Sequence, residues 1–117
     1  MEAVIFGFLH HIEVLRERGL PINRIVTSEG GASSPLWRQI AADILNQPIY
    51  SLQENPGSAN GAAMVAGRSI GIIENWEKID SFPRSITVNH PEQADQWVYK
   101  KNYQIYRDMY PKLKELF

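Results

Sequence analysis

The chain has 117 residues, with 12 basic and 13 acidic side chains and a formal net charge of −1. Because the charges are dispersed, the composition argues against a nucleic-acid surface, which usually needs a basic patch, and the absence of cysteine excludes disulfides and thiolate metal sites. No apolar run reaches the ~20 residues of a membrane span, and the first residues lack the features of a signal peptide, so we expect a cytoplasmic protein of one domain.

Residues 2–18 are predicted to form a helix, because apolar side chains recur there at helical spacing. The stripe consists of Ile5, Phe8, Leu9, Ile12 and Leu15. Gly19 and Pro21 are typical of a helix end. His10 and His11 are adjacent and therefore do not face one site on a helix, so we interpret both as surface residues rather than metal ligands.

A strand, a turn and a second helix follow. Residues 24–28 are predicted to form a strand, and residues 35–46 a helix with Ser34 as its cap and Pro35 at the first helical position. The buried face of this helix is expected to contain Leu36, Trp37, Ile40, Ala41, Ile44 and Leu45. Residues 49–52 form a second short strand, and a helix between two strands predicts a right-handed crossover and a parallel pair.

The second half of the chain is expected to be more helical than sheet-like. A third helix should begin at Asn55-Pro56 and fade near residues 71–73, residues 74–90 are interpreted as irregular, and a last helix starts at Pro91. Pro111 should break or kink this last helix after Tyr110. Ala59, Ala62, Ala63, Ala66 and Gly67 give the third helix a face of small residues, which suits close packing or a ligand. Trp37 and Trp97 lie on apolar stripes and are expected in the core.

The turn at Gly30-Gly31 is the first candidate for a binding site. Two glycines permit a tight turn and leave the backbone open to close approach, and the helix that follows presents N–H groups and the positive end of its dipole. Such an arrangement suits a phosphate group. The same turn also occurs in α/β domains without any ligand, so the pattern by itself leaves both readings open.

Three sequence blocks together resemble the FGGY family of carbohydrate kinases. The segment from Gly30 to Leu45 is similar to the family's Gly-Gly-Ala turn and Trp-Arg-Gln helix, and the segment from Asn60 to Gly67 looks like its late Gly-Ala-Ala helix. The stretch from Tyr103 to Pro111 resembles its closing tyrosine-rich helix. The blocks occur in family order over nearly the whole chain, and the likeness is strongest to the xylulose kinase branch.

The resemblance implies a fold and a nucleotide contact. It implies an α/β fold, the C-terminal part of an actin-like (ribonuclease H-like) ATPase domain with short parallel strands and packed helices. Gly30, Gly31 and Ala32 would lie along the nucleotide, near its ribose and α-phosphate, with Ser34 as a further contact beside its capping role. Glu29 departs from the family's common third glycine and its role stays open, and Ser33 stands where many relatives have Lys or Arg. Asn55 and Ser58 could face the nucleotide from the other side, although helix capping is the simpler interpretation.

The resemblance also implies an activity and a domain organisation. Residues 1–117 would be a partial C-terminal kinase domain, a fragment whose C-terminal helical segment is 91–117. The parent enzyme would use ATP and Mg²⁺ to phosphorylate a ketopentose such as xylulose; gluconate or another polyol is the alternative substrate, and a non-catalytic binding or oligomerisation module is the alternative role. No catalytic residue is assigned, because Asp43, Asp80, Asp95 and Asp108 have no paired partner at useful spacing. We therefore expect the isolated chain to be inactive and, through exposed strand edges and helix stripes, to form a homo-oligomer.

Overall fold

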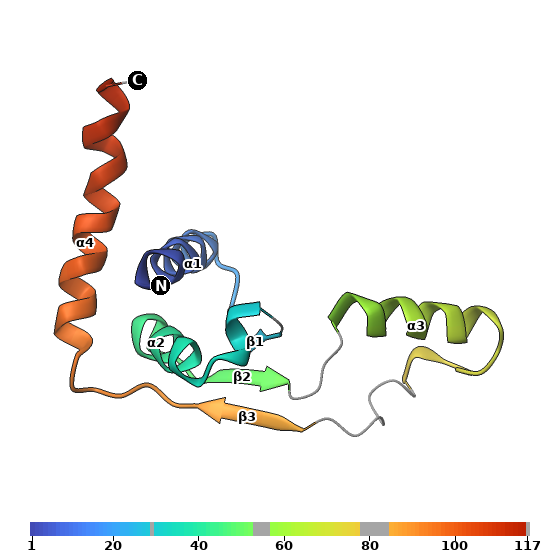
Figure 1. Ribbon diagram of the computed structural model, residues 1–117. Helices are drawn as coiled ribbons and strands as arrows, with labels where there is room; N and C mark the ends of the chain where they lie inside the picture. The colour runs from blue at the N-terminus through green and yellow to red at the C-terminus, as the bar shows by residue number, and fades with distance from the viewer. Residues whose placement is uncertain (29, 53–56, 78–84, 117) are drawn as a thin grey trace.

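The computed structural model describes residues 1–28, 30–52, 57–77 and 85–116. In chain order its helices and strands are α1 (Glu2–Glu17), β1 (Ile25–Thr27), a 3-10 turn (Gly30–Ser33), α2 (Pro35–Leu45), β2 (Ile49–Leu52), α3 (Gly57–Ser69), β3 (Ile86–Asn89), α4 (Gln96–Leu113) and a final 3-10 turn (Lys114–Leu116). Figure 1 shows α1 above α2 and α2 above β2 and β3, with α4 along one side and α3 projecting from the other.

The sheet has the strand order β1-β2-β3. Strands β1 and β2 are parallel, with Ile25 opposite Ile49, so the predicted α/β class and the parallel pair joined by a helix are confirmed. Strand β3 runs antiparallel to β2 and corrects the expectation that residues 74–90 are irregular. The signal was present in the sequence, because Ile86-Thr87-Val88 is a run of β-branched residues, which favour strands.

The two faces of the sheet differ in their cover. Helix α2 contacts β2 and β3, and the β2 side chains on that face, Ile49 and Ser51, are almost fully buried. The other face carries the alternate residues Val26, Tyr50, Leu52, Ile86 and Val88, which the strand register places side by side. Val26, Ile86 and Val88 are 49%, 43% and 37% exposed. We call these five residues the open sheet face.

The core lies between α1, α2, β2 and the first half of α4. Its buried residues are Ile5, Phe6, Ala41, Ala42, Ile44, Leu45, Ile49 and Tyr103, and Leu9, Ile12 and Trp37 pack against them. Leu15, Phe8 and Leu36, which were expected to be buried, are 37%, 50% and 60% exposed. Phe6 takes the place expected for Phe8, because the buried side of α1 faces the tyrosines of α4, whose rings at Tyr103 and Tyr106 lie 5.8 Å from that of Phe6.

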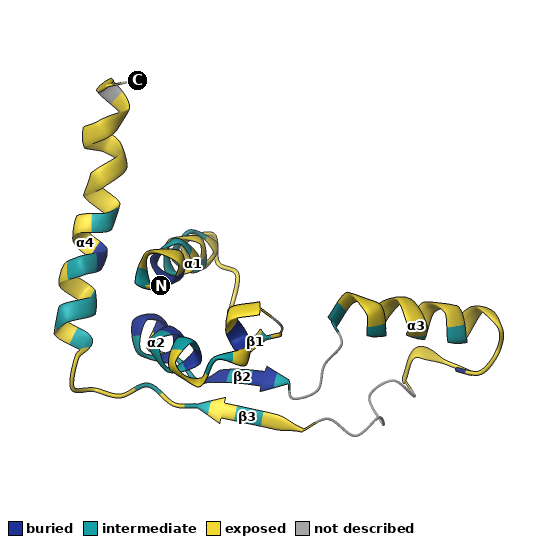
Figure 2. Cartoon of the chain, viewed as in Figure 1, coloured by how far each residue is buried: buried dark blue, intermediate teal, exposed yellow. Residues whose placement is uncertain are grey.

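Helices α3 and α4 have long exposed surfaces (Figure 2). Helix α3 buries no residue of its own, so its small-residue face is open, apart from Gly67, which contacts Ile73. The expected start of this helix at Asn55-Pro56 lies outside the described residues. Trp97 is 68% exposed, which corrects its expected place in the core, because only the side of α4 that carries Tyr99, Tyr103 and Tyr106 packs on α1 and α2.

The last helix also differs from expectation at both of its ends. It begins at Gln96 rather than at Pro91. It continues through Pro111 to Leu113, so of the break or kink expected after Tyr110 the break does not occur. A proline inside a helix removes one hydrogen bond, but Pro111 lies in the last turn of α4, where few bonds depend on it. No helix in the described ranges combines the length and apolarity needed to cross a membrane.

Candidate functional site

The glycine turn lies at the carboxyl end of β1 and leads directly into α2. Gly30 has φ +50°, a left-handed conformation that glycine adopts without steric cost. The Ser33 hydroxyl donates to the Gly30 carbonyl oxygen at 2.8 Å, and the Ser34 N–H donates to the Gly31 carbonyl oxygen at 3.0 Å. These bonds close the turn on itself while Gly30 and Gly31 remain exposed.

Gly31 lies against the indole ring of Trp37. A Cβ atom built at this position would approach the Trp37 Cε2 atom to 3.0 Å, which is closer than nine in ten real Cβ contacts. Any larger residue would therefore push either the turn or the indole out of place. The second glycine is required here by close packing, whereas the first is required by its backbone angle.

Ser34 is the N-cap of α2, as the sequence predicted. Its Oγ accepts a hydrogen bond from the Trp37 N–H at 3.4 Å, and Pro35 occupies the first helical position. The cap satisfies one of the amides that have no partner inside a helix. Its hydroxyl can still donate its own proton, so capping does not remove Ser34 as a ligand contact.

Ala32 and Arg38 form the buried base of the turn. Ala32 is 7% exposed and Arg38 is 8% exposed. The Arg38 Nη1 donates to the Ala32 carbonyl oxygen at 2.7 Å, and its Nε donates to Asn89 Oδ1 at 3.1 Å. Sequence reasoning missed this arginine, although its position three residues before Ala41 and seven before Leu45 places it on the buried stripe of α2.

Polar side chains also meet at the carboxyl ends of the parallel strands. Thr27 Oγ1 and Ser51 Oγ lie 2.8 Å apart, and Ser51 is 2% exposed. Ligands of open α/β sheets bind outside the carboxyl ends of the strands, which is the edge where the glycine turn begins. Glu29 and Asn55, both considered at this edge, lie outside the described residues, and Ser58 is exposed on α3.

The histidines and aspartates considered as metal ligands or as a base form no such site in the described parts of the chain. His10 and His11 are exposed, as expected, and no group of three His, Cys, Asp or Glu in the described residues could hold a metal ion. Asp43 Oδ1 accepts hydrogen bonds from Gln39 Nε2 at 2.9 Å and from the Glu92 N–H at 2.7 Å. It therefore anchors the segment after β3 to α2, and Asp80 lies outside the described residues.

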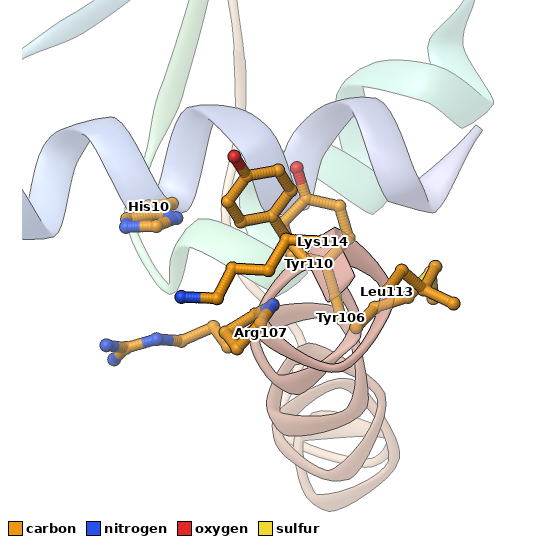
Figure 3. Close-up of a pocket in the computed structure, with 8 residues that line it drawn as sticks. His10, Tyr106, Arg107, Tyr110, Leu113 and Lys114 are labelled. Atoms are coloured by element: carbon orange, nitrogen blue, oxygen red, sulfur yellow. The ribbon is translucent and has the colours of Figure 1, made fainter. Parts of the chain in front are cut away.

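An apolar groove lies on the side of α4 that faces α1, with a volume of about 620 Å³. It is lined by His10, Tyr106, Arg107, Met109, Tyr110, Pro111, Leu113 and Lys114, and Figure 3 shows the side chains of Arg107 and Lys114 extending to the same side, below His10 in that view. None of the residues that line the groove belongs to the glycine turn. We therefore treat it as a separate surface.

The family model of the C-terminal domain of the FGGY family of carbohydrate kinases matches residues 1–70, more than half of the chain. The chain belongs to this family. Xylulose kinase of Bacillus subtilis (strain 168) is 32% identical to it over 117 residues, which cover 99% of this chain and 23% of the relative.

Solved FGGY structures have the same architecture. The crystal structure of xylulose kinase from Rhodospirillum rubrum matches with a TM-score of 0.78 and 35% identity over 98% of this chain and 24% of that one. A xyloylose kinase from Brucella ovis matches with a TM-score of 0.80 and 29% identity over 99% and 24%. The resemblance predicted from the three sequence blocks is confirmed, as is the actin-like fold. The chain spans about a quarter of the length of these relatives.

Proposed function

We propose that this chain forms one wall of the ATP site of a sugar kinase whose substrate is a ketopentose such as xylulose. The observation that carries the proposal is the exposed glycine turn at the carboxyl end of a parallel strand, which opens into the capped N-terminus of α2. Family membership and the xylulose kinase relatives support the kinase activity and the sugar.

The residues at the turn fit a nucleotide phosphate. Gly30 and Gly31 are exposed and carry no side chain that would keep a ligand from the backbone. In the first turn of α2, Pro35 has no N–H and the Trp37 N–H is bonded to Ser34, which leaves the Leu36 N–H without an intrahelical partner. The dipole of α2 favours an anion at this end. Because the Ala32 carbonyl is engaged by Arg38, Ala32 would contribute its backbone N–H, and Ser34 would contribute its hydroxyl.

Phosphoryl transfer to a sugar hydroxyl needs a carboxylate base, and ATP with Mg²⁺ supplies the phosphoryl group and neutralises its developing charge. We assign neither the base nor a Mg²⁺ ligand to this chain, because the Asp43 carboxylate accepts hydrogen bonds from Gln39 and from the Glu92 N–H, and the Asp108 carboxylate accepts one from Gln104. The role proposed for this chain is to bind and orient the nucleotide, while the sugar pocket and the base belong to other parts of the kinase.

The test is a titration of the isotope-labelled chain with ADP, followed by amide chemical shifts. We expect weak binding, because one wall of a site offers few contacts, with the shift changes centred on Gly30, Gly31 and Ala32. Changes centred instead on the groove around His10, or no change at millimolar ADP, would contradict the assignment.

A second measurement concerns turnover. We expect no sugar-dependent release of ADP when the chain is mixed with Mg-ATP and a panel of ketopentoses, polyols and gluconate, because no base has been assigned to it. Sugar-dependent release above a protein-free control would show that the chain carries a base, and the sugar that stimulates release would identify the substrate.

A further inference from the structure

A buried arginine connects the glycine turn to the strand at the other end of the sheet. Arg38 is 8% exposed, and burial of a charged group is costly unless it is well bonded. Its Nη1 and Nε donate to two uncharged oxygens, the carbonyl of Ala32 and Oδ1 of Asn89. The guanidinium on α2 therefore holds both the glycine turn, through Ala32, and the end of β3, through Asn89, although these two residues are 57 positions apart in the sequence.

The partner on β3 is itself oriented. Asn89 Nδ2 donates to Gln39 Oε1 at 3.1 Å, so the amide of Asn89 has its oxygen directed to Arg38. Gln39 Nε2 donates in turn to the carbonyl oxygen of His90 at 2.8 Å. Both Arg38 and Gln39 bind the end of β3, but of these two only Arg38 also contacts the glycine turn.

The direction of the contact matters for the turn. In a helical turn the N–H groups point toward the N-terminal end and the carbonyl groups toward the C-terminal end. Arg38 binds at the C-terminal end of the turn Gly30–Ser33, where a cation also complements the carbonyl dipoles. It can therefore hold the turn in place without occupying the amides of Gly30 and Gly31.

We propose that Arg38 is a positioning residue for the nucleotide: braced by Asn89, it fixes the glycine turn through the Ala32 carbonyl and keeps the amides of that turn preorganised. This inference rests on the proposed nucleotide site. A preorganised turn does not have to be ordered on binding, which raises affinity. Lysine would keep the charge but not the planar fork that spans both acceptors.

The decisive comparison is Arg38→Gln against Gln39→Ala, because both variants weaken the link between α2 and β3 but only the first releases the turn. We expect Arg38→Gln to weaken ADP binding about tenfold relative to Gln39→Ala, as expected when a support behind a binding group is lost. Arg38→Lys should recover part of this loss. Equal affinities in Arg38→Gln and Gln39→Ala would overturn the proposal.

Amide hydrogen exchange in the absence of ligand separates this inference from the proposed function. We expect faster exchange at Gly31, Ala32 and Ser33 in Arg38→Gln than in Gln39→Ala, measured relative to the exchange of core amides in α1. If the wild-type chain does not bind ADP, the proposed function fails, while this comparison still decides whether Arg38 holds the turn. Unchanged exchange at the turn would refute the brace.

Arg38→Gln could also fail to fold, since it removes a buried group that makes two hydrogen bonds. Asn89→Ala avoids this, because it leaves Arg38 and its bond to Ala32 in place and removes the second acceptor of Arg38 together with the hydrogen bond from Asn89 to Gln39. We expect this variant to show the same local increase of exchange at the turn, but smaller, and no such increase would argue against the role of Asn89.

Discussion

At the scale of single residues, the effect of adding a side chain at a glycine depends on which atoms the new Cβ would meet. Gly31 and Gly7 illustrate opposite cases. A Cβ atom at Gly31 would lie 3.0 Å from the indole of Trp37, whereas one at Gly7, inside α1, would lie 3.4 Å from the Tyr106 hydroxyl, an ordinary contact. The same chemical change should therefore have opposite effects on stability at the two positions.

We expect Gly31→Ala to lower the free energy of unfolding by about 1 kcal/mol, because overpacking against Trp37 forces a local shift. Gly7→Ala is the matched control and should raise it by about 0.5–1 kcal/mol, because alanine is favoured over glycine within a helix. Urea unfolding followed by circular dichroism measures both values. A stabilising Gly31→Ala would mean that the indole moves aside freely, and the close packing at the turn would lose its importance.

At the scale of elements, α4 is joined to α1 by a phenol and a carboxylate. The Tyr103 hydroxyl donates to Glu13 Oε2 at 2.5 Å, and Arg107 Nη1 lies 3.5 Å from the same oxygen. Burial raises the pKa of Tyr103 well above its ordinary value, and the hydrogen bond to Glu13 and its negative charge raise that pKa further. The protonated phenol is thus part of the link between the two helices.

This link predicts a loss of stability at high pH. The pKa of Tyr103 is higher in the folded chain than the value of about 10 in the unfolded chain. Its contribution is therefore fully present below about pH 10 and is lost as the pH rises toward the folded-state pKa. We expect the free energy of unfolding to fall more steeply above about pH 10 in the wild type than in Tyr103→Phe.

Denaturant unfolding at a series of pH values tests this expectation. Burial also raises the pKa of Tyr99, so Tyr103→Phe should retain the part of the slope that belongs to Tyr99, and Tyr99→Phe serves as the comparison. Identical slopes in the wild type and Tyr103→Phe would show that the phenol of Tyr103 does not couple α4 to α1.

The sequence predicted those elements whose patterns are local. Ser34 and Pro35 determine the start of α2, and its apolar spacing indicates a buried face, so that helix and its cap were foreseen. Contacts between residues that are distant in the sequence were not foreseen. Leu36 and Trp97 have apolar side chains but are exposed, without cover from the described elements. Arg38 is buried because its acceptors come from Ala32 and from Asn89 in β3, a strand within the region that was expected to be irregular.

At the scale of the whole molecule, the chain is more extended than its length requires. Its radius of gyration is 18.1 Å, compared with about 13 Å for a compact domain of this size. Helix α3 and the last turns of α4 project from the core (Figure 1), and the open sheet face has no helix over it in the described part of the chain. Contiguous exposed apolar surface favours association.

We therefore expect the chain to self-associate with rising concentration. Val88→Lys should weaken this association, because it places a charge on the open sheet face, opposite Tyr50, and lysine on an edge strand such as β3 opposes pairing with another chain. Sedimentation at several concentrations measures the effect, and Ser58→Lys on exposed α3 is the control for added charge. A wild-type chain that stays monomeric at high concentration would contradict the expectation of a homo-oligomer.

The contact between α1 and α4 also determines when this core can be completed during synthesis. Phe6 is synthesised well before Tyr103 and Tyr106, because these two residues, whose rings lie beside that of Phe6, come much later in the sequence. Ribosomes add about 5–20 residues per second, so α1 waits about 5–20 seconds for those rings. During that interval the apolar side of α1 lacks part of its final cover, and it is then that a chaperone bound to the nascent chain would protect it most.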